Sequence, residues 1–480
     1  MKKLTNPKFI AGVVLITMLM TIKPLSAEDN AAITPEGSST AGMTALGQKP
    51  GTSTIQRPLS LDDCIRIAIA RNPQQEAARQ GLIAAGEAVG EKRAPYFPQV
   101  DLAVGYARRE THAFLPQGLS LPDKADMIGP TDDWSSGIIG HLILFDSGKR
   151  RAELLAAMAN KKIAKEESSR MQQNIILNAH RAFYGLAAAL ENRAVIGKAL
   201  DRAVENLRVA EERHAAGDVP LADSLRARVE KSDAILSRVR GDSLIQIARG
   251  NLNQAMGLAV AMEIEIVVPQ VVVPALPPTL AEDAIHKAVD NRPETRAARQ
   301  HQEMAGQSVA AAKSAFGPKL AAKAQYGYRD DTFTPTDQDW FAGVNLEIPV
   351  FSGFAKSHAL DRKRAELSSV RAERVTIEQS VSQEVWDSYW RLREKHEAIG
   401  VADTLLADAT ESLRMARERY ENGVGTIADL LAAQSTLSKA ETVHVVSRWD
   451  YEIAHTELQR AMGELKGDNY SQGITLSEKR

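Results

Sequence analysis

The stretch ENLRVAEERHAAGDVPLADSLRAR, residues 205–228, decides the fold, because the chain repeats it as ESLRMARERYENGVGTIADLLAAQ, residues 411–434. Gly217 and Gly423 mark the same point in the two copies, 206 positions apart. The offset is unchanged from Phe145 onward, so no insertion or deletion separates the copies there. Loops vary freely in length, so this strict register predicts two long rods that end at the same level.

Nearer the N-terminus the offset between the copies is different. Pro73 and Pro293 are 220 positions apart, whereas Trp134 and Trp340 have returned to the offset of 206. The extra 14 residues of the first copy therefore lie in one segment. We assign this segment to a loop over Ala107–Asp133, since loops are where length varies.

The repeat makes most of the 480-residue chain one pseudo-symmetric unit of two copies. Repeat 1 spans residues 59–278 and repeat 2 spans residues 279–465. The 59 basic and 61 acidic side chains nearly cancel, so the chain has no basic field that would attract nucleic acid. Nucleic acid is therefore not an expected partner.

The two ends of the chain are expected to lie outside the fold. Residues 1–27 combine early lysines, an apolar run and a small residue at position 27, which predicts a secretory signal peptide. Residues 28–58 are rich in Ala, Thr, Gly, Ser and Pro and are predicted to be a disordered lead. Residues 466–480 form a C-terminal tail.

A hydrophobic period of two marks one hairpin in each copy, over residues 98–145 and 318–351. Val100, Leu102 and Val104, for example, alternate with polar or small residues, as in a strand with one apolar face. Strands of about ten residues cross a bilayer, and aromatic residues gather at the strand ends as interfacial girdles do. A sandwich core would also alternate, but the chain offers no other sheet for these hairpins to pack against.

Long helices follow each hairpin. Lys149–Ala216 is almost free of Pro and Gly and predicts a rod of about 100 Å at 1.5 Å per residue. The chain returns through Leu221–Met256 and Leu280–Lys313, and the second copy has Lys356–Asn422 and Ile427–Leu465. No stretch beyond the signal peptide has about 18 consecutive apolar residues, so any membrane insertion of this chain would involve the strands.

The four strands of one chain cannot close a barrel, and open sheet edges in lipid leave backbone groups unpaired. The chain must therefore oligomerise. Two copies give eight strands with a filled interior, whereas three give twelve strands and room for a channel. The polar face of the hairpins favours water inside, so we predict three copies. The residues assigned to the lumen are His141, Lys319, Lys323, Gln325, Asn345 and Glu347.

These features resemble those of the TolC-type outer membrane efflux proteins, from Leu59 to about Leu465. The features that carry the resemblance are the double repeat, the Asn-Pro and Arg-Pro helix restarts, the FDSG and VFSG junctions, and the RHAAGDVPLAD and RYENGVGTIAD turns. The resemblance implies an α+β membrane protein that forms a homotrimer. Its twelve-stranded transmembrane β-barrel would lie in the outer membrane and continue as a long periplasmic α-helical barrel.

The resemblance also implies partners and a function. The inner end of the helical barrel would dock a periplasmic adaptor, or membrane fusion protein, which connects it to an inner-membrane transporter of the RND, ABC or MFS type. Outer membrane lipid would surround the strands. The implied function is the exit duct of a tripartite efflux pump or a type I secretion system, with no cofactor.

The turns between the long helices are the candidate functional site. The residues assigned to adaptor docking are Gly217, Asp218, Val219, Pro220, Gly423, Val424, Gly425 and Thr426. By resemblance, Asp223 and Asp429 form acidic rings at a narrow periplasmic gate, and Tyr420 hydrogen-bonds to Asp223. A simpler interpretation is that the aspartates are helix-start charges, which favour a first turn.

The tips depart from the family pattern at two positions. Relatives carry an arginine two residues after the second glycine, which helps to tie the closed state, and this chain has Gly425 there. A second acidic ring would fall on Ala432. The closed state is therefore expected to be held more weakly, or by other residues.

Nothing in the sequence predicts an enzyme. The GDSL motif at residues 241–244 lies inside a predicted helix, away from any turn that could present a nucleophile. The ten histidines are scattered and do not form a zinc motif. We therefore expect no catalytic residue and no metal site. The alternative function is a periplasmic coiled-coil scaffold or adhesin without channel activity, against which the amphipathic hairpins argue.

Overall fold

The computed structural model describes residues 57–112, 127–270 and 280–465. The predicted signal peptide, nearly all of the predicted lead and the predicted tail lie outside these residues. In the described ranges, none of the helices carries an apolar stretch long enough to span a bilayer.

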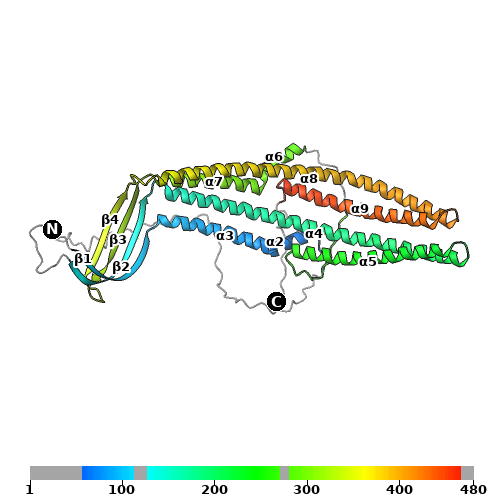
Figure 1. Cartoon of the computed structure of the whole chain (residues 1–480), viewed down its shortest axis with the longest axis horizontal. Coiled ribbons are helices and arrows are strands. Elements are labelled where there is room, and N and C mark those ends of the chain that lie inside the picture. The colour runs from blue at the N-terminus through cyan, green and yellow to red at the C-terminus, as the bar shows by residue number, and fades with distance from the viewer. Residues whose placement is uncertain (1–56, 113–126, 271–279, 466–480) are drawn as a thin grey trace, which may run out of the picture. The chain divides into compact units, whose positions relative to one another are not determined.

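Four antiparallel strands form one sheet in the order β1-β2-β3-β4 (Figure 1). They are β1 (Gln99–His112), β2 (Met127–Phe145), β3 (Lys319–Asp330) and β4 (Gln338–Glu347). The pairing of β2 with β3 joins the two repeats through backbone hydrogen bonds. Within the described residues, β1 and β4 are the edges of the sheet, and each is paired on one side only.

The first hairpin is longer than predicted, and the assignment of all of Ala107–Asp133 to a loop is wrong. Both strands continue into this segment, and Ala107 pairs with Asp133 in the ladder. Two ion pairs support the extension, because Arg109 lies 3.0 Å and Arg329 lies 2.5 Å from the Asp133 carboxylate. Backbone pairing and cross-strand charges thus continue where the apolar alternation has stopped.

The helix bounds follow the repeat offsets. α4 (Lys149–Ala215) and α8 (Ala355–Glu421) have 67 residues each and begin 206 positions apart, as do the 35-residue helices α5 (Leu221–Ala255) and α9 (Ile427–Ala461). The shorter helices begin 220 positions apart: α2 (Leu61–Arg71) and α6 (Ala281–Asn291), and α3 (Pro73–Arg93) and α7 (Pro293–Ser314). A 3-10 turn, η1 (Ala94–Tyr96), follows α3. α4 packs against α5 and α9, and α8 packs against α9 (Figure 1).

A single arginine ties the sheet to the first long helix. The chain leaves β2 through a left-handed turn at Gly148, where φ is 91°. Arg150, in the first turn of α4, donates to the Asp146 carboxylate at 3.0 Å and to the carbonyls of Pro95 at 2.9 Å and Ile143 at 2.7 Å. One guanidinium therefore connects η1, the end of β2 and the start of α4.

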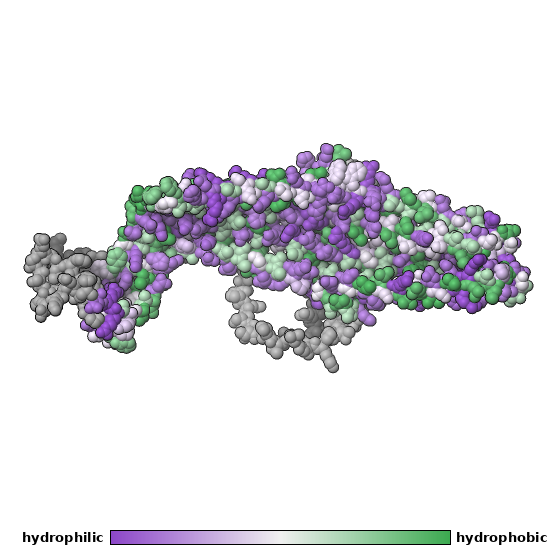
Figure 2. Space-filling view, viewed as in Figure 1, coloured by the Kyte–Doolittle hydropathy of each residue, from purple (hydrophilic) through white to green (hydrophobic). Residues whose placement is uncertain are grey.

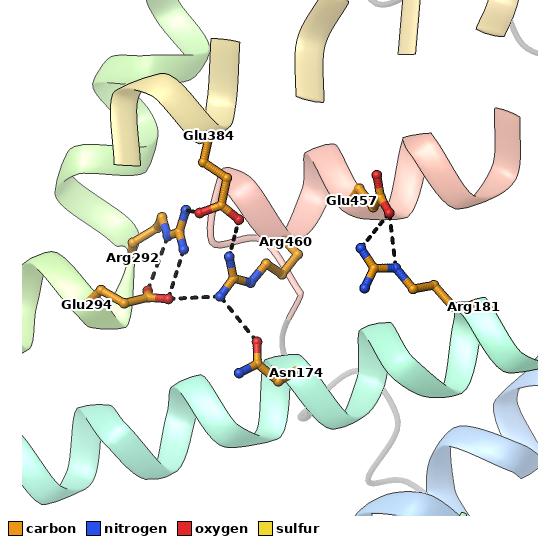
Figure 3. A network of polar contacts seen from close by, with 7 residues as sticks. All are labelled: Asn174, Arg181, Arg292, Glu294, Glu384, Glu457 and Arg460. Carbon is orange, nitrogen blue, oxygen red and sulfur yellow. Dashed lines mark hydrogen bonds and ion pairs between the residues drawn. The ribbon is translucent and has the colours of Figure 1, made fainter. Parts of the chain in front are cut away.

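A network of charged side chains joins repeat 2 to α4 where α7 begins and α9 ends (Figure 3). Glu294 accepts from Arg292 at 2.8 Å and from Arg460 at 3.0 Å, and both arginines also donate to Glu384. Arg460 donates in addition to Asn174 of α4 at 3.2 Å. Burial raises the pKa of Glu294, but its bonds with Arg292 outweigh burial and hold this pKa below its usual value. The network therefore stays charged at neutral pH.

Repeat 1 builds the equivalent joint without charge. The repeat offsets map the four charged residues onto Asn72, Gln74, Asn178 and Gln254. Asn72 donates from Nδ2 to the Ala255 carbonyl at 3.1 Å and accepts at Oδ1 from the Gln74 N–H at 2.9 Å. Repeat 1 therefore stabilises the start of α3 by neutral hydrogen bonds, whereas repeat 2 stabilises the start of α7 by ion pairs.

The charged joint should tolerate truncation less well than the neutral joint. Arg292→Ala should lower the free energy of unfolding by about 3 kcal/mol, because this side chain is only 3 % exposed and its removal leaves two carboxylates sharing one arginine. Asn72→Ala should cost about 1 kcal/mol. Denaturant unfolding of the detergent-solubilised protein, followed by circular dichroism, measures both losses. Equal losses would show that the charges add nothing to the joint.

Candidate functional site

Two exposed turns of the same construction close the far ends of the long helices. Gly217 ends α4 and Gly423 ends α8, with φ of 83° and 77° in the left-handed region that favours glycine. After each glycine, the N–H of the next residue donates to the carbonyl five positions back, at 2.9 Å in both turns. Of the predicted docking residues, Gly217, Asp218, Pro220, Gly423, Val424 and Thr426 are exposed, and Val219 and Gly425 are half-buried.

The two predicted gate aspartates have different surroundings. Asp429 is exposed and forms a capping box, in which its N–H donates to Thr426 Oγ1 at 3.1 Å and its carboxylate accepts from the Thr426 N–H at 3.3 Å. Hydrogen bonds from Thr426 hold the pKa of Asp429 below its usual value. Asp223 follows Pro220, which provides no side-chain cap, and its mostly buried carboxylate lies 3.4 Å from Arg226. Asp429 is thus a helix-start charge that also faces solvent.

Tyr420 does not make the hydrogen bond to Asp223 that the resemblance implied. Its ring is buried, with 2 % exposure, and its hydroxyl has no hydrogen-bond partner within the described residues. Burial and the nearby Asp223 carboxylate raise the pKa of Tyr420, so the hydroxyl remains protonated. The side chain that engages Tyr420 is Arg213 from the other tip. Its guanidinium lies over the ring, 4.9 Å from the centroid, and donates to the Tyr420 carbonyl.

Gly425, the position at which the resemblance implied an arginine, lies in a tight turn against the end of α8. A Cβ at this position would lie 3.0 Å from Arg419 Cβ and from the backbone nitrogen of Tyr420. The Gly425 N–H also donates to the Arg419 carbonyl at 2.9 Å, which pulls the turn tightly against the end of α8. A side chain at this position would require a small shift of the surrounding backbone. The side-chain contact between the tips at this level comes from Arg213. Arg213 and Arg419 occupy the same position in the two copies of the repeat, but the sequence alone did not indicate this role.

Buried polar contacts continue from the tips along α4 and α9. Arg202 and Glu441 form an ion pair of 2.7 Å between mostly buried side chains. Between this pair and the tips, the buried amides of Asn206 and Gln434 are hydrogen-bonded. Ion pairs and amide pairs between mostly buried side chains favour one register of the two helices over others. The two tips of one chain are therefore held together at several levels.

The six residues assigned to the lumen share one face of the sheet. Directly paired residues lie on the same face, and the register places Lys319 opposite Glu347 and His141 opposite Lys323. β1 adds Gln99, opposite His141, which the sequence analysis did not assign. That this face borders a lumen stays a prediction. The other face presents exposed apolar side chains: Val100, Leu102, Val104, Tyr326, Trp340, Val344 and Leu346.

The structure gives the GDSL segment a packing role. Residues 241–244 lie inside α5, where a Cβ on Gly241 would meet Ile196 of α4 at 3.1 Å. Asp242 is bound by Arg193 of α4 at 2.5 Å. In the part of the chain that the structure describes, no group of His, Cys, Asp and Glu is placed to hold a metal ion.

Comparison with known proteins gives consistent matches over most of the chain. The family model described as outer membrane efflux protein matches residues 64–258 and 284–464. Protein CyaE of Bordetella pertussis is 27% identical over 422 residues, covering 85% of this chain and 84% of CyaE. The outer membrane efflux protein BepC of Brucella suis is 23% identical over 451 residues, covering 91% and 90%. The crystal structure of the outer membrane protein VceC from Vibrio cholerae superposes with a TM-score of 0.71 at 20% identity, covering 84% of this chain and 96% of VceC.

Proposed function

The chain belongs to the outer membrane efflux protein family, and from this premise we propose that three copies assemble into one export duct whose inner entrance is formed by the helix tips. Membership places the chain in the outer membrane, with its helices extending into the periplasm, as a channel of the efflux and secretion class. We also propose that the chain catalyses no reaction.

The observation that carries the proposed trimer is the pair of open sheet edges. β1 and β4 each lack a partner on one side within the described residues, and they run antiparallel to each other. β4 of one copy can therefore pair with β1 of the next, and repeating this contact closes a ring. Three copies supply twelve strands, enough to surround a channel lined by the polar face, whereas eight strands would be filled by side chains.

The tips are the proposed docking site for a periplasmic adaptor. They are the far ends of the rods, and their backbone turns are exposed on both repeats. The proposed adaptor connects the duct to an inner-membrane transporter of the RND, ABC or MFS type. Relatives include a pyoverdine export outer membrane protein and a cobalt-zinc-cadmium resistance protein, so they favour no single cargo for this chain.

Reconstitution tests the proposed channel. Protein extracted from outer membranes should produce discrete conductance steps in a planar lipid bilayer. Recovery in the soluble periplasmic fraction, together with no conductance, would overturn the proposal and favour the periplasmic scaffold instead.

The proposed acidic ring predicts a change in ion selectivity. Asp429→Asn removes the charge but keeps an oxygen that can accept from the Thr426 N–H, so the helix start is retained. The cation-to-anion permeability ratio should fall several-fold, because three carboxylates at a narrow opening favour cations. Asp223→Asn is the matched control and should change this ratio less, since Asp223 is mostly covered and paired with Arg226. An unchanged ratio for Asp429→Asn would place this residue away from the pore.

A further inference from the structure

A histidine is buried where α4 of repeat 1 packs against α9 of repeat 2. Polar side chains cover much of the helical surface in view (Figure 2), whereas His180 of α4 is only 7 % exposed. Its Nδ1 lies 3.4 Å from Thr456 Oγ1 of α9, and its ring centroid lies 5.8 Å from that of Tyr184. The half-buried His455 of α9 is near enough to act on its charge. Two imidazoles therefore share one contact between the repeats.

The hydrogen bonds at this contact determine which ring nitrogen of His180 carries the hydrogen. The Thr456 hydroxyl donates its one hydrogen to the Glu452 carbonyl at 3.0 Å, so towards His180 it can only accept. Nδ1 therefore carries the hydrogen, and Nε2 is a bare acceptor. Nε2 is buried and has no hydrogen-bond partner within the described residues. A second proton on His180 would have to bind Nε2, where the new N–H is buried without an acceptor.

Both imidazoles are neutral at pH 7. Burial and the neighbouring His455 lower the pKa of His180 to about 4. Burial also lowers the pKa of His455, although the charge of Glu464 opposes this shift. Because a histidine in an unfolded chain titrates near pH 6.5, acidification from about 6.5 to 4 favours states in which His180 is exposed to water. Above this range the contact keeps its full stability.

The surroundings of His180 provide no anion that would stabilise its protonated form. The elements that share the core beside it are α9, α2 and the end of α5. Their titratable and charged groups are Glu452, His455 and Glu457 of α9, Glu464 just after α9, Asp63, Cys64 and Arg66 of α2, and Arg249 of α5. Glu457 and Asp63 are each paired with an arginine, at 2.5 Å and 2.7 Å (Figure 3 shows the first pair). Burial raises the pKa of Glu452, which disfavours its anion, and Glu464 acts on His455.

The internal repeat does not require histidines at these positions. The offset of 206 maps His180 onto Trp386 and His455 onto Arg249. Trp386 is 44 % exposed in this chain, so its surroundings differ from those of the buried His180. The histidine pair is therefore a feature of the α4–α9 contact alone and not of the repeated fold.

We propose that the α4–α9 contact at His180 is an acid-sensitive contact between the two helical hairpins of one chain, which opens when a proton binds Nε2. Opening lets water reach the imidazole, and hydration then stabilises the charged ring. α4 leads to the tip at Gly217 and α9 starts from the tip at Gly423, so an opened contact lets the two tips of a chain move apart. The acid-sensitive contact itself stands without the proposed duct, whereas its effect on the entrance rests on that duct.

Hydrogen exchange of the full-length, detergent-extracted protein tests this contact. Peptides that contain residues 175–186 and 449–460 should exchange at least tenfold faster at pH 5 than at pH 7.5, after correction for the intrinsic exchange rate. His180→Asn should remove this acceleration, because its amide can still donate to Thr456 but does not titrate. Residues 320–328 of β3 should keep their corrected rates at both pH values.

Two further variants make the test specific to His180. His358→Asn changes an exposed histidine of α8 and should leave the acid response intact. His455→Asn should weaken the response without removing it, because His180 then loses one cause of its low pKa.

The unaltered protein alone can overturn the proposal, since its exchange is measured without any variant having to fold. Equal corrected rates at pH 5 and pH 7.5 would do so, as would an acceleration that His180→Asn retains in full. An intact acid response in a protein that gives no conductance would instead overturn the proposed duct and leave the acid-sensitive contact standing.

Discussion

Replacing Arg213 with alanine should leave the periplasmic entrance open for most of the time. The variant loses both the hydrogen bond from Arg213 to the Tyr420 carbonyl and the stacking on the Tyr420 ring, two contacts that join the tips of one chain. A charge-assisted hydrogen bond and a partly buried cation–π contact together contribute about 2 kcal/mol. The ratio of closed to open entrances should therefore fall more than tenfold. Single-channel recording in planar bilayers would show this as a long-lived state of high conductance.

Two variants test whether Arg213 keeps the entrance closed through its contacts with Tyr420 or through its charge alone. Arg208→Ala removes an exposed arginine of α4 whose partners among the described residues are Glu205 and Glu212 on its own helix, so its recordings should match those of the unaltered protein. Arg213→Lys keeps the charge but loses the planar stacking group. Its open time should lie between those of Arg213→Ala and the unaltered protein. Equal open times for Arg213→Ala and the unaltered protein would show that Arg213 does not keep the entrance closed.

Replacing both tip glycines with valine should abolish adaptor binding while leaving the trimer intact. Gly217 and Gly423 hold φ values of 83° and 77°, which cost a β-branched residue about 1–2 kcal/mol or more at each position. The strained turns would rearrange, and the exposed backbone that is proposed to receive the adaptor would change shape. The amount of adaptor that copurifies after cross-linking should fall at least tenfold.

Two controls identify the backbone turn as the cause. Gly217→Asn with Gly423→Asn should retain most of the binding, because asparagine tolerates the left-handed region. Gly185→Ala, in the interior of α4, should bind as the unaltered protein does, because among the described residues no heavy atom beyond its chain neighbours and the adjacent helix backbone lies within 4 Å of the added Cβ. Full adaptor binding by the double valine variant would place the docking site elsewhere.

The sequence predicted the helical part well, because the information lies in the repeat itself. Strict offsets of 206 and 220 restrict where loops can occur, and the helices begin at positions that obey these offsets. The matches to the outer membrane efflux protein family confirm the recognition of the fold class. The outer ends of β1 and β2 were missed, because Arg109 and Asp133 stabilise them by cross-strand charge pairing. Such pairing leaves no apolar period to detect.

The contacts at the tips depend on distances between segments far apart in the sequence. Arg213 and Tyr420 are 207 positions apart and meet only because two helical hairpins pack side by side. The capping box of Thr426 and Asp429 was visible as a local spacing and supports the simpler interpretation of that aspartate. Periodicity alone could not indicate the charged joint around Arg292, since its counterparts in repeat 1 are neutral.

The native mass of the detergent-extracted protein tests the central claim most directly. In the proposed duct, the two sheet edges that are open within the described residues pair with further copies, so the protein released from outer membranes in a mild detergent should have the mass of three chains. A folded monomer or dimer, stable under the same conditions, would contradict the proposed duct.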